Sequence, residues 1–306
     1  MQGVGRLEGR DKRGHPPVLD YGESTYEQDF WRGRNRDYED AAERRALRRL
    51  LPPTGDRLVD VGAGFGRLAD LYSGYRQSIL IDYSPDLLRD ARKRLAHRPP
   101  LTLAASFYDI PLADGACDTA VMVRALHHAA DVPAVLAELR RILRPGGALV
   151  LEHANKRHLK AVLRYWLGRG PNPFSLEPLE FARLNFDFHP AYIRQALRTA
   201  GFEVEEARAV SFFRLPLFKR LLPPQGLAAL DGLLQRPLAP LALSPSIMLR
   251  CRVVGPEALA TGQGERPLFR CPRCHATDLA ADTPERLVCR RCHSVWPITD
   301  GIHHFR

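Results

Sequence analysis

The stretch Leu58-Val59-Asp60-Val61-Gly62-Ala63-Gly64-Phe65-Gly66-Arg67 decides the fold of this 306-residue chain. Its mostly apolar start is typical of a short parallel strand that is buried on both faces. The three glycines that follow let a ligand lie against bare backbone at the beginning of the next helix. The stretch therefore predicts a strand, a glycine turn and a helix that meet at a ligand site.

The spacing of the glycines indicates which ligand this is. A dinucleotide-binding motif has its third glycine three residues after the second, where this chain has Arg67, and Asp60 would repel a pyrophosphate. S-adenosylmethionine (SAM) has no phosphate, and its methionine end carries an ammonium group and a carboxylate. Asp60 and the backbone N–H groups of the turn can bind these two groups, so we expect SAM here. A tight turn in some other α/β protein is the alternative.

A second strand, expected at residues 77–81, ends at Asp82. An acid at the carboxyl end of the second strand is placed to hold a ribose diol. Tyr83 beside it can cover one face of an adenine. Ser84 and Pro85 then predict the start of a helix, with the serine as its N-cap and the proline in its first turn.

With these motifs the chain resembles the class I SAM-dependent methyltransferases, in order through residue 152. The expected fold is α/β, a Rossmann-like, doubly wound sheet of seven strands with a small C-terminal zinc ribbon. Further strands are expected at residues 101–105, 119–123, 148–151, directly after Gly201-Phe202, and at 246–254, with a helix at 132–143. The last two strands should form an antiparallel hairpin at the sheet edge.

The resemblance also implies an adenine-binding loop at residues 106–118. Ser106 stands where the family usually has an aspartate that contacts the adenine amino group. That contact could come from Ser106, from Asp109 or from the backbone. The full set of expected cofactor-binding residues is Asp60, Gly62, Ala63, Gly64, Gly66, Asp82, Tyr83, Ser106, Phe107 and Arg124.

Candidate catalytic residues follow strands four and five, at the edge toward which the methyl group should point. They are His127, His128 and Glu152. Methyl transfer from a sulfonium is an in-line displacement, which needs a general base only when the acceptor carries a proton. A histidine with a pKa near neutrality could take that proton, although such residues also serve packing. The Asn/Asp-Pro-Pro motif of enzymes that methylate adenine or amide amines does not occur at residues 124–127, which disfavours that subclass.

Four of the six cysteines form two Cys-x-x-Cys pairs separated by fourteen residues. The pairs are Cys271 with Cys274 and Cys289 with Cys292, and this spacing is typical of a structural zinc ribbon. We expect His275 and His293 to be bystanders. A closed site of four thiolates should not touch the chemistry, so losing the metal should loosen only the tail.

The tail strengthens this interpretation, because residues 268–306 resemble the methyltransferase-activator zinc-ribbon family. The resemblance rests on the two knuckles together with the ending Trp296-Pro297-Ile298-Thr299-Asp300-Gly301-Ile302. Members of that family are small proteins that dock on methyltransferases acting on tRNA, rRNA and translation factors. Here the ribbon is fused to the enzyme domain.

These features divide the chain into four parts. They are a disordered N-terminus (1–20), a methyltransferase domain (21–255) with a substrate-roof insertion (154–190), a linker (256–266) and the zinc ribbon (267–306). A leading helix at residues 38–51 is expected to cover the SAM pocket. Tyr26, Phe30 or Trp31 could contact the ligand, or could simply pack this helix onto the sheet.

The net charge of +10 lies mainly in residues 154–250, which hold 14 basic and 7 acidic residues. This excess suggests an acidic substrate, a nucleic acid or an anionic membrane surface, unless it is only a solvated surface. Apolar roof side chains, which are Leu163, Tyr165, Trp166 and Phe174, favour an enclosed pocket for a small-molecule or lipid-like acceptor.

Two alternatives to that acceptor class stay open. The first is an RNA methyltransferase that grips tRNA or rRNA through the ribbon and through the basic roof residues Lys156, Arg157, Lys160 and Arg164. The second is a ribbon that docks a protein partner. No apolar run approaches the roughly 18 residues of a membrane span, so we expect a cytoplasmic protein without one.

Overall fold

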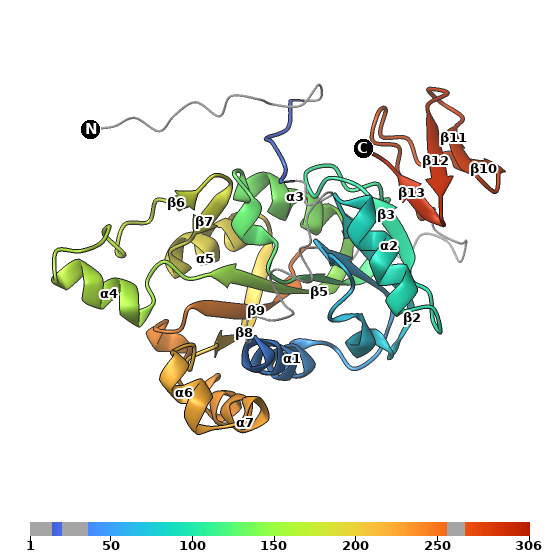
Figure 1. Ribbon diagram of the computed structural model, residues 1–306. Coiled ribbons are helices and arrows are strands. Elements are labelled where there is room, and N and C mark those ends of the chain that lie inside the picture. Colours follow the sequence, from blue (N-terminus) through green and yellow to red (C-terminus); the bar gives the residue numbers. More distant parts are fainter. Residues whose placement is uncertain (1–13, 20–35, 256–266) are drawn as a thin grey trace.

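The computed structural model describes residues 14–19, 36–255 and 267–306 of the protein (Figure 1). The expected linker, the aromatic residues Tyr26, Phe30 and Trp31, and all of the expected disordered N-terminus except residues 14–19 lie outside these ranges. Among the described helices, none combines the length and the apolar character needed to cross a bilayer.

Seven strands form the sheet that the sequence predicts, in the order β3-β2-β1-β4-β5-β9-β8. Strands β1 to β5 are parallel, and β9 runs antiparallel between β5 and β8. The strands are β1 (Gly55–Val61), β2 (Tyr75–Asp82), β3 (Leu101–Ala104), β4 (Cys117–Met122), β5 (Leu143–Ala154), β8 (Phe202–Val210) and β9 (Ser246–Val253). This arrangement confirms a doubly wound fold whose carboxyl strand ends share one edge.

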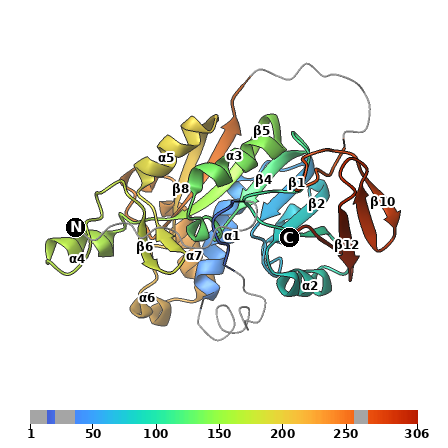
Figure 2. The same cartoon turned by 90° about the horizontal axis from the view of Figure 1, so that it is seen from above.

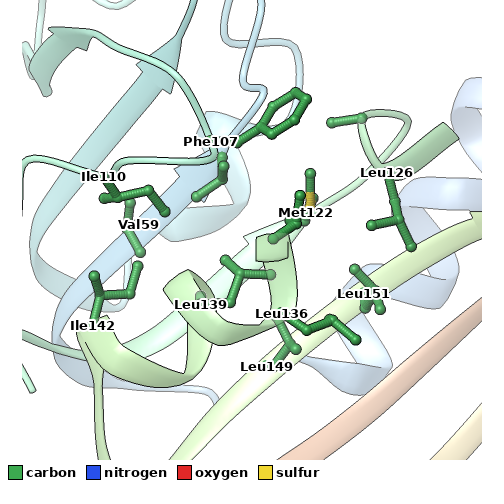
Figure 3. Close-up of a cluster of buried hydrophobic side chains, with 14 of the residues drawn as sticks. Val59, Phe107, Ile110, Met122, Leu126, Leu136, Leu139, Ile142, Leu149 and Leu151 are labelled. Atoms are coloured by element: carbon green, nitrogen blue, oxygen red, sulfur yellow. The ribbon is translucent and has the colours of Figure 1, made fainter. Parts of the chain in front are cut away.

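Helices cover both faces of the sheet (Figure 1). Since side chains alternate along a strand, Leu58 of β1 faces one layer, while Val59 and Val61 face the other. The first layer holds α1 (Asp37–Leu50), α2 (Pro85–Arg94) and α7 (Pro224–Leu234), and the second holds α3 (Val132–Ile142) and α5 (Pro190–Thr199). Figure 3 shows the second layer, where Leu136 and Leu139 of α3 pack toward the sheet.

Two helices begin directly after polar N-cap residues. Ser84 accepts a hydrogen bond from the Leu87 N–H at 3.4 Å, and Asp131 accepts one from the Ala134 N–H at 3.0 Å. Strand β5 begins at Leu143 instead of residue 148, because Gly146, at φ 73°, lets the chain turn while the pairing of Cys117 with Leu143 is kept.

The zinc-ribbon region continues the sheet, which the sequence did not predict. It contains β10 (Leu279–Thr283), β11 (Arg286–Cys289), β12 (Val295–Thr299) and β13 (Ile302–His304). These strands pair antiparallel with one another, and β13 pairs parallel with β3, with Ile302 opposite Thr102. The Phe305 N–H also donates to the Ala104 carbonyl at 2.8 Å. The described sheet therefore has eleven strands.

The roof differs from its expected role as a closed cover. It contains α4 (Leu159–Trp166), β6 (Leu179–Ala182) and β7 (Asn185–Asp187), and a further short helix, α6 (Pro216–Leu221), lies near it. The four side chains expected to enclose a pocket are exposed, namely Leu163 (47%), Tyr165 (38%), Trp166 (69%) and Phe174 (42%). That expectation was wrong because α4 projects from the body and buries only Val162.

Three short 3-10 helices lie in the part of the chain that the structure describes. They are η2 (Ala69–Tyr72), η3 (Leu126–His128) and η4 (Ala239–Leu241). Of these, η3 matters most for the site, because it follows β4 at the carboxyl edge and carries His127 and His128.

Candidate functional site

The glycine turn after β1 opens a cleft at the carboxyl edge of the sheet. Gly62 has φ 76°, and a Cβ there would lie 2.3 Å from the Cβ of Ala125. Gly64 has φ 54°, and a Cβ there would meet nothing within 4 Å, so its backbone borders open space. Gly66 instead packs against Ala91 of α2. Both turn positions favour glycine, at Gly62 also because a Cβ would clash, and Gly64 leaves backbone accessible to a ligand.

The cleft has about 860 Å³ of free space, including its opening to solvent. Nine of the expected residues line it, namely Asp60, Gly62, Ala63, Gly64, Asp82, Tyr83, Phe107, Arg124 and His128. Gly66, Ser106, His127 and Glu152 are not among its lining residues. Val18, Leu19 and Leu87 also line it, and no motif in the sequence marks them.

Two carboxylates dominate the cleft. Asp60 is buried and accepts a hydrogen bond from the Tyr72 hydroxyl at 2.7 Å. Burial raises its pKa to about 7, although Tyr72 and Arg67 act in the opposite direction. Asp82 accepts from the Gly64 N–H at 2.8 Å and from the Ser84 N–H at 2.9 Å, which ties the glycine turn to the end of β2. A buried carboxylate with a raised pKa suits a ligand that brings positive charge, as SAM does.

This raised pKa makes the affinity for SAM depend on pH. A cationic ligand favours the ionised form of Asp60, so binding below pH 7 should release a proton. We expect the affinity to rise by up to about tenfold per unit between pH 5.5 and 6.5, then to level off near pH 7, where the ligand's α-amino group is still largely protonated. Calorimetric titrations at several pH values, in two buffers of different ionisation enthalpy, measure both effects. A wild-type affinity that does not change with pH would contradict this expectation. So would an Asp60→Asn variant whose affinity rises with pH as steeply as that of the wild type.

Tyr83 and Phe107, which the sequence predicts to lie at the adenine, both line the cleft. The Ser106 hydroxyl accepts a hydrogen bond from the Tyr108 N–H at 3.1 Å and so closes a local turn outside the cleft. The C-terminal Arg306 lies over the Tyr83 ring, 5.3 Å from its centroid, and donates to the Tyr83 carbonyl at 3.1 Å. The zinc-ribbon region thus contacts a residue of the cleft.

An acid on α1, Glu43, joins the two loops that form the cleft. It is buried, and its carboxylate accepts from Arg124 Nε at 2.7 Å and from Arg67 Nη2 at 2.8 Å. Burial alone would raise the pKa of Glu43, but Arg124 and Arg67 outweigh it and lower the pKa to about 2. Glu43 was not predicted from the sequence. Its position on the apolar side of α1, beside Ala42 and Leu47, was the available signal.

The candidate base Glu152 supports the backbone at Arg124, directly after β4. Its carboxylate accepts from the Arg124 N–H at 2.9 Å and from the Ser246 hydroxyl, and burial raises its pKa. Arg124 has φ 57°, a strained conformation for a side chain of its size, and Glu152 helps to hold it. Both carboxylate oxygens are therefore engaged by the protein itself.

The two histidines lie side by side, with ring centroids 3.9 Å apart. Burial lowers the pKa of His127 well below its usual value, and it lowers that of His128 as well. His128 Nδ1 lies 3.0 Å from the Leu184 carbonyl, so this nitrogen carries the proton and Nε2 is left as an acceptor. Both rings are neutral at pH 7, which makes them weaker bases than a histidine of ordinary pKa.

Asp187 and Arg214 are two further charged residues that were not predicted for the site. Strand β7 packs against η3, the turn that carries His128. Asp187 ends β7, and burial raises its pKa to about 6, with Glu152 raising it further and Arg214 and Lys156 opposing the rise. Within the described residues, neither Asp187 nor Arg214 has a side-chain hydrogen bond or ion pair. The alternation of buried Phe186 and Phe188 around Asp187 was the signal for it.

The four ribbon cysteines come together. Their sulfur atoms all lie within 4.8 Å of one another, with Cys271 Sγ 3.7 Å from Cys292 Sγ and Cys274 Sγ 3.5 Å from Cys289 Sγ. Four sulfurs around one ion at about 2.3 Å would be about 3.8 Å apart, so the cluster can hold a tetrahedral metal. His275 and His293 lie outside the cluster, and each occupies the positive-φ position that closes a knuckle, with its N–H donating to Cys271 or Cys289.

Comparison with known proteins agrees with this geometry. Residues 59–151 match the family model described as "Methyltransferase domain". A demethylmenaquinone methyltransferase of Tropheryma whipplei (strain Twist) is 29% identical over 199 residues, which cover 61% of this chain and 83% of that protein.

Solved structures share the fold. A SAM-dependent methyltransferase from Thermotoga maritima superposes with a TM-score of 0.54 at 21% identity, covering 76% of this chain and 98% of that one. A chain from the solved complex that contains the Haloferax volcanii Trm112 methyltransferase activator gives a TM-score of 0.52 at 21% identity, covering 75% and 97%. At these identities the likeness concerns the fold.

Proposed function

Because the chain carries a SAM-dependent methyltransferase domain, we propose that it methylates a small-molecule or lipid-like acceptor. The observation that carries this proposal lies beside the cofactor cleft. His128 lines the cleft and is fixed by the Leu184 carbonyl, and β7, which ends at Asp187, packs against η3, which carries His128. The Asp187 carboxylate has no hydrogen bond or ion pair within the described residues. The relative with 83% coverage is named for demethylmenaquinone, a small molecule, which supports the same class.

SAM, when bound, supplies the methyl group for an in-line displacement. Asp60 and Asp82 would hold its methionine and ribose ends, and Tyr83 and Phe107 would border its adenine. Asp187 is our candidate for the base that removes a proton from an acceptor hydroxyl. A carboxyl of pKa about 6 is ionised at pH 7, yet it is more basic than an ordinary aspartate. His128 Nε2 is the alternative base.

We further propose that the cysteine cluster holds one structural Zn²⁺ and that the ribbon docks on its own enzyme domain. The pairing of β13 with β3 and the contact of Arg306 with Tyr83 support docking within one chain. The RNA alternative has weaker support. Of its four proposed grip residues, Lys156 is buried, and its ammonium donates to the carbonyls of Ser175 and Glu177.

Transfer of tritium from [methyl-³H]SAM to demethylmenaquinone, reduced with dithionite and dispersed in detergent, tests the acceptor class. We expect label in the lipid extract, with a rate that rises with pH through about 6, because the base must lose its proton. Asp187→Asn should lower kcat by about 100-fold and abolish this rise, while SAM affinity stays unchanged. Glu177→Gln, an exposed roof acid, is the matched control. Label in bulk RNA and none in lipid or small-molecule fractions would contradict the proposal.

A further inference from the structure

Exposed large apolar side chains are concentrated on α4, the roof loop and α6. Monomeric proteins rarely expose so many large apolar side chains in one region. We call this set the α4–α6 surface, and its members are Leu159, Leu163, Tyr165, Trp166, Leu167, Phe174, Leu176, Phe181, Leu215, Leu217, Leu221 and Leu222. The most exposed are Trp166 at 69% and Leu221 at 68%.

These elements have little contact with the rest of the described structure. Helix α6 buries no residue, and α4 buries only Val162. An amphipathic helix normally turns its apolar face to the protein core. Within residues 14–19, 36–255 and 267–306, no part of the chain covers these apolar faces.

The two helices belong to one end of the molecule. Figures 1 and 2, seen at right angles, both place α4 and α6 at the end opposite the zinc-ribbon strands. His158 is the N-cap of α4. Burial lowers its pKa most, and the charge of Arg214, two residues before α6, lowers it further, so Arg214 lies near the start of α4. The charge of Arg214 also acts on Asp187, so this end of the molecule borders the proposed acceptor site.

The two helices of this end are basic, although the roof loop between them adds Glu177, Glu180 and Arg183. Residues 157–169 contain Arg157, Lys160, Arg164 and Arg169 and no acid, and residues 214–222 contain Arg214, Lys219 and Arg220 and no acid. Lys219 pairs with Glu39 of α1. Exposed leucines and a tryptophan among basic side chains are the composition of helices that lie in the headgroup layer of anionic membranes.

We propose that the α4–α6 surface binds the headgroup and upper acyl region of an anionic phospholipid bilayer. This inference rests on the proposed function, because it lets an apolar acceptor dissolved in the bilayer reach the edge of the cleft near Asp187. RNA would use the basic side chains but leave the exposed leucines in water. An anionic bilayer can pair with the basic side chains and bury the exposed leucines at the same time.

Sedimentation of the full chain with vesicles tests the proposal. We expect binding to vesicles of equal parts phosphatidylglycerol and phosphatidylcholine, little binding to phosphatidylcholine alone, and a decline with salt. Lys160→Gln with Arg164→Gln should weaken binding by about 25-fold, at about 5-fold for each charge lost. Leu163→Ser with Trp166→Ser should weaken it by at least about 10-fold.

Matched controls use exposed side chains elsewhere. Arg49→Gln on α1 and Val295→Ser on β12 should change binding by less than about twofold. In a Trp31→Phe, Trp296→Phe background, Trp166 is the single tryptophan, and lipids brominated on their acyl chains should quench its emission.

Three results would overturn the inference. One is the absence of binding to the anionic vesicles by protein that still binds SAM. Another is equal binding by the wild type and both double variants. The third is self-association, or salt-sensitive binding of bulk RNA, that the Leu163 and Trp166 substitutions abolish while vesicle binding is absent. The methyl-transfer assay in detergent needs no bilayer, so it tests the proposed function independently of vesicle binding.

Discussion

Replacing Glu43 by Gln is expected to lower the free energy of unfolding by about 3 kcal/mol, the lower end of the range for breaking a buried ion pair. The lower end applies because the Arg67 and Arg124 side chains keep 11% and 15% exposure. The pKa of Glu43 is about 2 in the folded protein, below its ordinary value of 4.5, so this stabilisation is complete above pH 4.5 and is lost as the pH falls through 2. Urea unfolding at pH 7 measures it.

The same change should weaken SAM binding, because Glu43 joins the glycine-turn arginine to the loop after β4 that lines the cleft. Asp90→Asn is the matched control, since Asp90 pairs with Lys93 on the surface and should contribute less than about 0.5 kcal/mol. Equal unfolding free energies for Glu43→Gln and Asp90→Asn would show that α1 does not brace the site as described.

Replacing Cys289 by Ser is expected to abolish binding of one zinc ion per chain and to unfold the ribbon strands. Metal binding and folding are coupled in such modules, with apparent zinc-binding free energies of about 10 to 16 kcal/mol. The sequence predicted that only the tail would loosen. The structure predicts an effect beyond the tail, because β13 pairs with β3, and Phe269 pairs with Leu112 in the expected adenine loop. We therefore expect weaker SAM binding as well.

Metal analysis of protein purified without chelators, together with calorimetry, measures both consequences. Cys251→Ala is the control, because this buried thiol lies in β9 outside the cluster and should leave the zinc content unchanged. Wild-type protein without stoichiometric zinc, or zinc retained by Cys289→Ser, would contradict the metal assignment. Normal SAM affinity in a zinc-free ribbon would contradict the coupling.

Local patterns explain what the sequence predicted. The apolar runs, the glycine turn and the Ser84 cap are encoded within a few residues, so β1 to β4 lie within three residues of their expected bounds and α2 begins where expected. The cysteine cluster was also predictable, because two tight knuckles of known spacing specify one site.

Features that depend on distant partners were not predictable. Glu43 is an ordinary helix acid until Arg67 and Arg124 meet it from two other loops. The pairing of β13 with β3 joins segments about 200 residues apart along the chain, and an exposed strand edge has no distinctive sequence. The apolar face of α4 was visible in the sequence, but its periodicity does not say whether that face packs against the protein or lies outside it.

The central claim, that this cleft holds SAM through Asp60 and Asp82, is tested most directly by calorimetric titration of SAM into wild-type protein and Asp82→Ala. The account predicts one site per chain and an affinity reduced by about 10- to 150-fold in the variant, the 1.5 to 3 kcal/mol typical of a charge-assisted hydrogen bond. The exposed neighbour Asp86, changed to Ala, should bind like the wild type. Equal affinity in wild type and Asp82→Ala would contradict the account.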